Sequence, residues 1–198
     1  MPKPKRVTVV LCVLVCLVPM VAVTVLATLA ELGTSEPVTS RDHGRLPVIH
    51  DLAPERALTE QPTWLRTRHW DGRMEYEYIL RAPDLYMDSR LISAPSEADA
   101  HAVFSEERAL PRAHDLFDLR SEYRARQLDE TSLLADELAL HTITRADEPY
   151  GAYALTRRGR HVLRVHVEGL HPTDDALLEL LDRYLTRLVA DDRSAAAG

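Results

Sequence analysis

The most pronounced hydrophobic pattern is a run of 24 uncharged, mostly apolar residues, 7–30. A helix of that length is about 36 Å long, which exceeds the hydrocarbon core of a bilayer at about 30 Å. Lys3, Lys5 and Arg6 precede the run, and Glu31 follows it. Because Lys and Arg are retained on the cytoplasmic side, the pattern predicts a cell-membrane protein that crosses once. Its amino terminus is then cytoplasmic and the rest of the chain extracytoplasmic.

A cleaved signal peptide is the alternative interpretation of this run. The apolar part of a signal peptide is about 7–15 residues long, and this run is longer. Thr28 and Ala30 are small enough for a cleavage site, so cleavage stays open. A lipoprotein is disfavoured because Cys12 and Cys16 lie inside the apolar run.

Residues 31–62 are predicted to be an extended linker. Four prolines, at positions 37, 47, 54 and 62, interrupt any long helix, and apolar residues are sparse. Extended, proline-bearing chain acts as a semi-rigid spacer. We therefore expect the linker to hold the folded domain a few nanometres from the membrane.

Regular structure is predicted from Thr63 onward, where apolar and polar residues alternate on both sides of Asp71-Gly72. This pattern indicates a β-hairpin with a two-residue turn. Such a turn directs Tyr76 and Tyr78 toward the core and charged residues outward. The expected outward cross-strand pairs are Arg66 with Glu77 and Arg68 with Glu75.

The remaining chain alternates between strand and helix signals, and ends in leucines at helical spacing. We expect strands at 85–93 and 138–145, a loop at 147–151, and a hairpin of 152–157 with 160–168 about Arg158-Gly159. We expect a helix from the Ser96 N-cap to about residue 110, where Pro111 ends it or starts a second helical segment that reaches about residue 127. A final helix is expected from Thr173 or Asp174 to about residue 190.

These elements predict an α+β fold: an antiparallel sheet of about six strands flanked by helices, preceded by a single N-terminal transmembrane helix. The predicted boundaries are a cytoplasmic N-terminus at 1–6, a transmembrane helix at 7–30, a linker at 31–62, an extracytoplasmic domain at 63–190 and a flexible tail at 191–198.

The element order, together with the segment RRGRHVLRVHVEG at 157–169 and the terminal amphipathic helix, resembles a group of small exported bacterial domains. These are α+β domains of the PsbP-like or LpqN-like kind, in which helices flank an antiparallel sheet. The resemblance covers residues 63–190. It implies a non-catalytic binding, sensor or assembly domain.

Composition narrows the choice of partner. The whole chain carries a formal net charge of −7, and three of its cations precede the apolar run, so the remainder carries −10. Nucleic-acid binding needs a basic surface, so this class is disfavoured. The chain contains no Asn and no Lys after Lys5, which indicates a GC-rich bacterial genome. The extracytoplasmic side is then the periplasm or the cell exterior.

Signals for catalysis and cofactors are weak. His166, Glu168 and His171 are spaced H-x-E-x-x-H, which is not the adjacent His-Glu order of the zinc-protease helix. No G-x-S-x-G and no glycine-rich phosphate loop is present. We therefore expect no metal and no cofactor. The alternative is an envelope enzyme whose site is built from His141, His166 and Glu168.

Two groups of residues are candidates for partner binding. A basic hairpin tip could contact anionic lipid, an acidic polymer or an acidic protein, although a solvated hairpin is the simpler interpretation. An apolar strand face is expected to lie beneath the helices of 96–127, and would be a partner site if it were bare. The basic group is Arg157, Arg158, Arg160 and Arg164, and the apolar group is Tyr153, Leu155 and Val162. The leading hypothesis is a membrane-anchored, non-catalytic domain that binds a ligand or an envelope partner.

Overall fold

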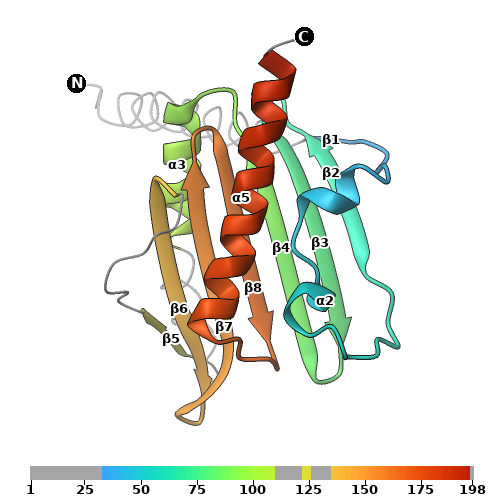
Figure 1. The fold of residues 1–198 in the computed structure, drawn as a ribbon, viewed down its shortest axis with the longest axis vertical. Coiled ribbons are helices and arrows are strands. Elements are labelled where there is room, and N and C mark those ends of the chain that lie inside the picture. The colour runs from blue at the N-terminus through green and yellow to red at the C-terminus, as the bar shows by residue number, and fades with distance from the viewer. Residues whose placement is uncertain (1–32, 110–121, 126–134, 197–198) are drawn as a thin grey trace, which may run out of the picture.

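Eight strands form one antiparallel sheet in a computed structural model that describes residues 33–109, 122–125 and 135–196. The strand order is β1-β2-β3-β4-β8-β7-β6-β5 (Figure 1). The strands are β1 (Thr34–Ser35), β2 (Thr63–Arg68), β3 (Met74–Ala82), β4 (Leu85–Ser93), β5 (Glu122–Ala125), β6 (Glu137–Arg145), β7 (Glu148–Arg158) and β8 (His161–Glu168). The helices are η1 (Asp42–Arg45), α2 (Ile49–Leu52), α3 (Glu97–Glu107) and α5 (Asp174–Ala196).

The predicted fold class is wrong in its strand number. The sheet has eight strands rather than six, because β1 and β5 were not expected. Residues 122–125 were expected to be helical, but they pair with β6, and the exposed Glu122 and Arg124 flank the half-buried Tyr123. That alternation is the period of a strand. Among the described residues no helix is long and apolar enough to cross a membrane, and residues 7–30 lie outside them.

The first hairpin has a three-residue loop, Trp70-Asp71-Gly72, instead of the expected two-residue turn. The backbone N–H of His69 donates to the carbonyl of Arg73 at 2.9 Å, and Gly72 has φ +87°. A left-handed glycine closing such a loop is the usual three-residue hairpin geometry. This loop shifts the register by one residue.

The shifted register overturns the expected ladder of Arg and Glu pairs. Arg66 lies opposite Tyr76, and its guanidinium is 5.7 Å from the centre of that ring. Glu75 and Glu77 therefore point to the other face of the sheet. Because successive side chains of a strand point to opposite faces of the sheet, a shift of one residue in register gives each side chain a different set of cross-strand neighbours.

The later hairpins also turn at positions that differ from those expected. The β6–β7 turn is Ala146-Asp147, with φ of 51° and 66°, so most of the expected loop at 147–151 belongs to β7. Arg158 pairs with His161, so the β7–β8 turn is Gly159-Arg160 rather than Arg158-Gly159. Two-residue turns with positive φ match the twist of the strands that they join.

One face of the sheet forms the main core beneath α5, which crosses it in Figure 1. Tyr76 and Tyr78 are 6% and 2% exposed, which confirms that they point inward. The leucine stripe of α5 packs against them, and the helix continues through residues 191–196, which were expected to fray. The buried residues of α5 are Leu177, Leu180, Leu181, Tyr184, Leu185 and Leu188.

The described part of the expected linker packs on the domain. Leu46 and Ile49 are 1% and 0% exposed and belong to the main core. The hydroxyl of Tyr184 on α5 donates to Asp51 at 2.9 Å. Leu46 and Ile49 therefore anchor a segment whose composition is typical of a spacer. The chain lies against the domain from Thr34 onward.

The other face of the sheet is covered in part by α3. The hydroxyl of Ser96 accepts the backbone N–H of Asp99 at 3.1 Å, which confirms the predicted N-cap. Val103 and Phe104 pack on the sheet from this helix. The chemistry that the sequence singled out lies on this face.

Candidate functional site

Four strands place a row of polar side chains on the face that carries α3. His141, Tyr153, His166 and Asp88 are successive cross-strand neighbours on β6, β7, β8 and β4. The ring of Tyr153 stands between the two imidazoles, 5.8 Å from His141 and 6.2 Å from His166 between centroids. Since neighbouring strands are about 4.8 Å apart, the two histidines are separated by about 10 Å.

The three residues of the alternative enzyme site are therefore only partly brought together. Nε2 of His166 lies 3.1 Å from Oε1 of Glu168 and 3.3 Å from the hydroxyl of Tyr123, while His141 stands beyond Tyr153. His171, past the end of β8, contacts the carbonyl of Gly151 at 3.1 Å. Within the described ranges, no three His, Cys, Asp or Glu side chains are arranged to hold a metal ion.

A continuous chain of ion pairs, here called the ion chain, crosses the same face. His69 contacts Glu75 at 2.7 Å, and Arg90 contacts both Glu75 and Glu107, the latter at 2.9 Å. Arg164 contacts Glu107 at 2.8 Å and also Asp88. Each of these side chains is 27% exposed or less. The members in order are His69, Glu75, Arg90, Glu107, Arg164 and Asp88.

The sheet register explains why α3 completes the ion chain. Arg90 and Arg164 lie directly opposite each other on β4 and β8, and like charges in that position repel. Glu107, at the end of α3, accepts hydrogen bonds from both guanidinium groups. Burial alone would lower the pKa of Arg164, but Asp88 and Glu107 outweigh burial and raise it. The ion chain thus holds charged residues in place and fastens α3 to the sheet.

Glu75 and Glu77 lie on the same strand face but differ in charge environment. Burial raises the pKa of Glu75, but hydrogen bonds from Arg90 and His69 outweigh burial, so the pKa falls below its usual 4.5. For Glu77, burial and the neighbouring Asp88 carboxylate raise the pKa above 4.5. Ionised Glu75 therefore stabilises the fold above about pH 4.5, whereas ionised Glu77 costs stability as the pH rises through its folded pKa.

Opposite effects are expected when each carboxylate is replaced by an amide. At pH 7, Glu75→Gln should lower the free energy of unfolding by about 2 kcal/mol or more, because it breaks a buried pair. Glu77→Gln should leave it unchanged or raise it by up to about 1 kcal/mol, because it removes an unfavourable buried charge. Urea unfolding at pH 7 and pH 4 measures both, and the two differences should shrink at the lower pH. Destabilisation by Glu77→Gln equal to that by Glu75→Gln would contradict this assignment.

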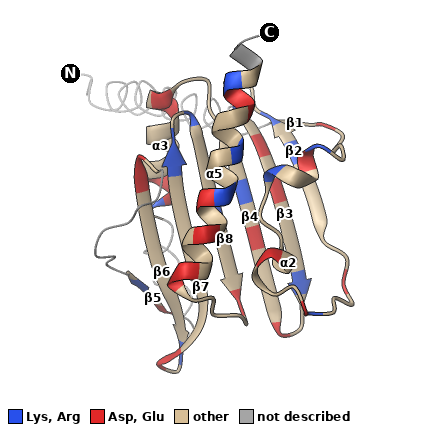
Figure 2. Ribbon diagram, viewed as in Figure 1, with Lys and Arg blue, Asp and Glu red and all other residues tan. Residues whose placement is uncertain are grey.

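The arginines expected at a basic hairpin tip are divided between the surface and the interior. Arg157 contacts Glu137 and Asp136, the latter at 3.2 Å, and Arg160 contacts Asp192 at 2.8 Å. Arg158 is half-buried, and Arg164 belongs to the ion chain. Figure 2 shows acidic and basic segments interspersed at this end of the molecule. A shared basic surface made of these four residues is therefore not formed.

The expected apolar partner residues are buried. Tyr153, Leu155 and Val162 are 4%, 0% and 1% exposed and pack with Val103 and Phe104 of α3. The expected cover by a helix from residues 96–127 is therefore present over these residues, and the alternative of a bare face is wrong. These three residues are part of the core in this structure.

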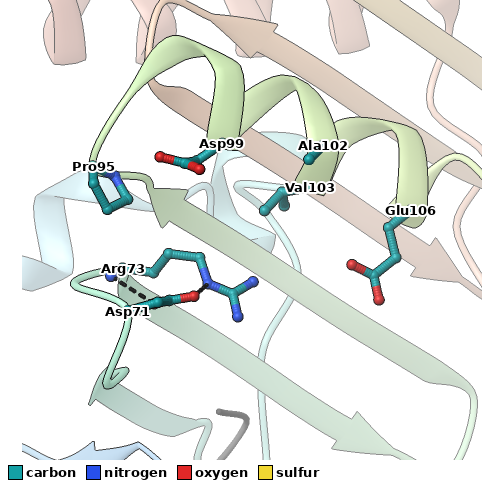
Figure 3. A pocket seen from close by; sticks show the side chains of 7 residues that line it. All are labelled: Asp71, Arg73, Pro95, Asp99, Ala102, Val103 and Glu106. Carbon is teal, nitrogen blue, oxygen red and sulfur yellow. Dashed lines mark hydrogen bonds and ion pairs between the residues drawn. The ribbon is translucent and has the colours of Figure 1, made fainter. Parts of the chain in front are cut away.

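An open cavity of about 340 Å³ lies between the β2–β3 loop and α3 (Figure 3). Asp71 and Arg73 line it from the loop, where they form an ion pair at 2.5 Å. Asp99 and Glu106 line it from the helix, so three carboxylates and one guanidinium surround the space. Its apolar lining is Pro95, Ala102 and Val103. The indole of Trp70, next to Asp71 in the loop, is 78% exposed.

The sequence indicated both walls of this cavity but not their proximity. The hairpin loop and the helix cap were each predicted, yet they are separated along the chain by the whole of β3 and β4. The loop and the helix meet because β3 and β4 pair along their whole length. The end of β4, at Ser93, therefore lies beside the start of β3, at Met74.

The chain matches no protein-family model, no curated protein and no solved structure. The resemblance to PsbP-like or LpqN-like domains stays a prediction. A function for this chain is therefore argued from the geometry of its own residues.

Proposed function

We propose that this protein is a single-pass, membrane-anchored protein whose extracytoplasmic domain binds a partner without catalysis. The cavity between the β2–β3 loop and α3 is the observation that carries the proposal, because ligand sites are concave and combine apolar walls with a few polar groups. The uncharged run at 7–30 supports the location. The polar residues of the ion chain are paired with one another, an arrangement that suits a binding domain better than a catalytic one.

The lining of the cavity favours a cationic group on the partner. Arg73 neutralises Asp71, so the carboxylates of Asp99 and Glu106 supply the remaining charge. A Lys or Arg side chain from an envelope protein could place its apolar stem on Ala102 and Val103 and its charge at these carboxylates. Such a domain would serve as a sensor, an assembly factor or an accessory subunit of an envelope complex.

Site-specific photocrosslinking in the native membrane tests this proposal. A photoreactive residue replaces Ala102, which is exposed beside the cavity, in the full-length protein. The matched control replaces Ala176, which is equally small and exposed but lies on α5, the helix of the opposite face. We expect a defined protein to be trapped from position 102 and not from position 176.

The chemistry of recognition is tested in the same experiment. Glu106→Gln should reduce the crosslinked product from position 102 about tenfold, because it removes one charge-assisted contact. Glu106 is exposed, so the substitution leaves the core intact. Equal products from positions 102 and 176, or no product from 102, would refute the cavity as the binding site. A product that is insensitive to Glu106→Gln would refute recognition of a cation.

A further inference from the structure

The chain joins the folded domain at the end of the sheet where β2 runs into β3, here called the hairpin end. Thr34 pairs with Arg68, the last residue of β2, and the backbone N–H of Glu36 donates to the carbonyl of Arg66 at 2.8 Å. Gly33 approaches the same strand so closely that an added Cβ would lie 3.0 Å from the carbonyl oxygen of Arg68. The position of the first described residues is thus fixed relative to β2.

The path from the apolar run to this point is short. Only residues 31–33 separate Ala30 from Thr34. Fully extended, four residue steps span at most about 14 Å. The interfacial layer of a bilayer is itself about 5–8 Å thick on each side. If residues 7–30 lie in the membrane, as proposed above, the hairpin end lies at the membrane surface and not nanometres away from it.

An exposed tryptophan stands at this end. Trp70 follows Arg68 by two residues and is one of two large apolar side chains that are clearly exposed in the described structure, the other being Leu65 at 41%. Tryptophan is enriched where a membrane meets water, because its ring is apolar and its N–H needs a polar partner. A loop that lies near lipid would therefore place the indole of Trp70 at the membrane–water interface, where tryptophan is enriched.

Three arginines at the hairpin end are paired with carboxylates. Arg68 contacts Glu36, Arg73 contacts Asp71 and Arg160 contacts Asp192, each within 2.8 Å. This end consequently lacks the excess of cations by which polybasic segments select anionic lipid. We infer that the hairpin end is a membrane-facing surface, and that Trp70 inserts its indole among the headgroups of a zwitterionic bilayer. The inference rests on the proposed membrane anchorage.

The orientation has a consequence for the proposed partner. The cavity shares Asp71 and Arg73 with the loop that carries Trp70, so it opens beside the membrane surface. Its occupant would be a cationic segment that lies close to the membrane, such as residues adjoining the membrane-spanning part of another envelope protein.

Fluorescence quenching by lipid tests this orientation, because the chain contains only two tryptophans. Trp64 on β2 packs against Tyr78 and His43, with ring centroids 4.9 and 4.3 Å away, and precedes Trp70 by six residues. Strand β2 continues for four residues past Trp64, which span about 13 Å, so Trp64 is an internal control set back from the surface. The full-length protein is placed in phosphatidylcholine vesicles with and without brominated acyl chains.

We expect brominated lipid to quench the Trp70 component, obtained by subtracting the spectrum of Trp70→Phe from that of the wild type, about twofold. The Trp64 component, seen directly in Trp70→Phe, should be unchanged. Equal quenching of the two components, or none of Trp70, overturns the orientation. Flotation of the same samples separates the two proposals. Protein that floats with the vesicles but shows no Trp70 quenching refutes only the orientation, whereas protein that does not float refutes the anchorage as well.

Discussion

Replacement of Arg164 by methionine is expected to lower the free energy of unfolding by about 3–5 kcal/mol. Arg164 pairs with Asp88 and Glu107, and the three side chains are 12%, 10% and 9% exposed. Methionine fills a similar length of space but leaves both carboxylates buried with one fewer cation. Urea unfolding of the full-length protein in detergent, followed by circular dichroism, measures the loss.

A surface arginine provides the control for this substitution. Arg124 contacts Asp147 and Glu122, whose side chains are 86% and 72% exposed, so Arg124→Met should cost no more than about 1 kcal/mol. Adding Asp88→Asn to Arg164→Met should recover about 1–2 kcal/mol by removing one uncompensated buried charge. Similar costs for Arg164→Met and Arg124→Met would show that the ion chain does not fasten α3 to the sheet.

Gly169→Ala is expected to cost about 3 kcal/mol or more. Gly169 ends β8 with φ +79°, and an added Cβ would lie 1.9 Å from the carbonyl oxygen of Asp84. The obstacle is backbone, so no side-chain rotation relieves the contact. The strained conformation and the contact both oppose the folded state, and thermal unfolding of the variant measures their sum.

Gly159→Ala separates the two contributions. Gly159 also has positive φ, +55°, but an added Cβ would meet nothing within 4 Å. Its substitution should therefore cost only the left-handed conformation, about 1 kcal/mol. If the two alanine variants are equally destabilised, the close approach of Gly169 to the β3–β4 turn is not rigid.

The sequence predicted an element correctly where its local pattern was compatible with only one structure. Strand β4 has the expected bounds, and Ser96 caps α3 as its spacing with Asp99 indicated. The first hairpin failed because an Asp-Gly pair suits two loops, a two-residue turn or the end of a three-residue loop. The observed register places Arg66 beside Tyr76, whose ring and hydroxyl also contact Arg45 from 31 residues earlier in the chain, so contacts outside the hairpin support this register.

The candidate site shows the same division between local and distant information. Strand parity correctly placed His166 and Glu168 on one face of β8 and His161 on the other. It could not show that Tyr153 separates His141 from His166, because that depends on the pairing of three strands. The cavity was missed for a related reason, since its walls meet only after β3 and β4 have paired.

The placement of β4 beside β8 governs the order in which this chain can fold. Ser93 pairs with His161, 68 residues later, and this central ladder joins the two halves of the sheet. Strands β2–β4 therefore keep an open edge until β8 has been synthesised. Such long-range pairing folds slowly because the loop between the strands must close first. With the extracytoplasmic location proposed above, the chain gains its central contacts only near the end of translocation, and its open β4 edge is the segment that most needs protection until then.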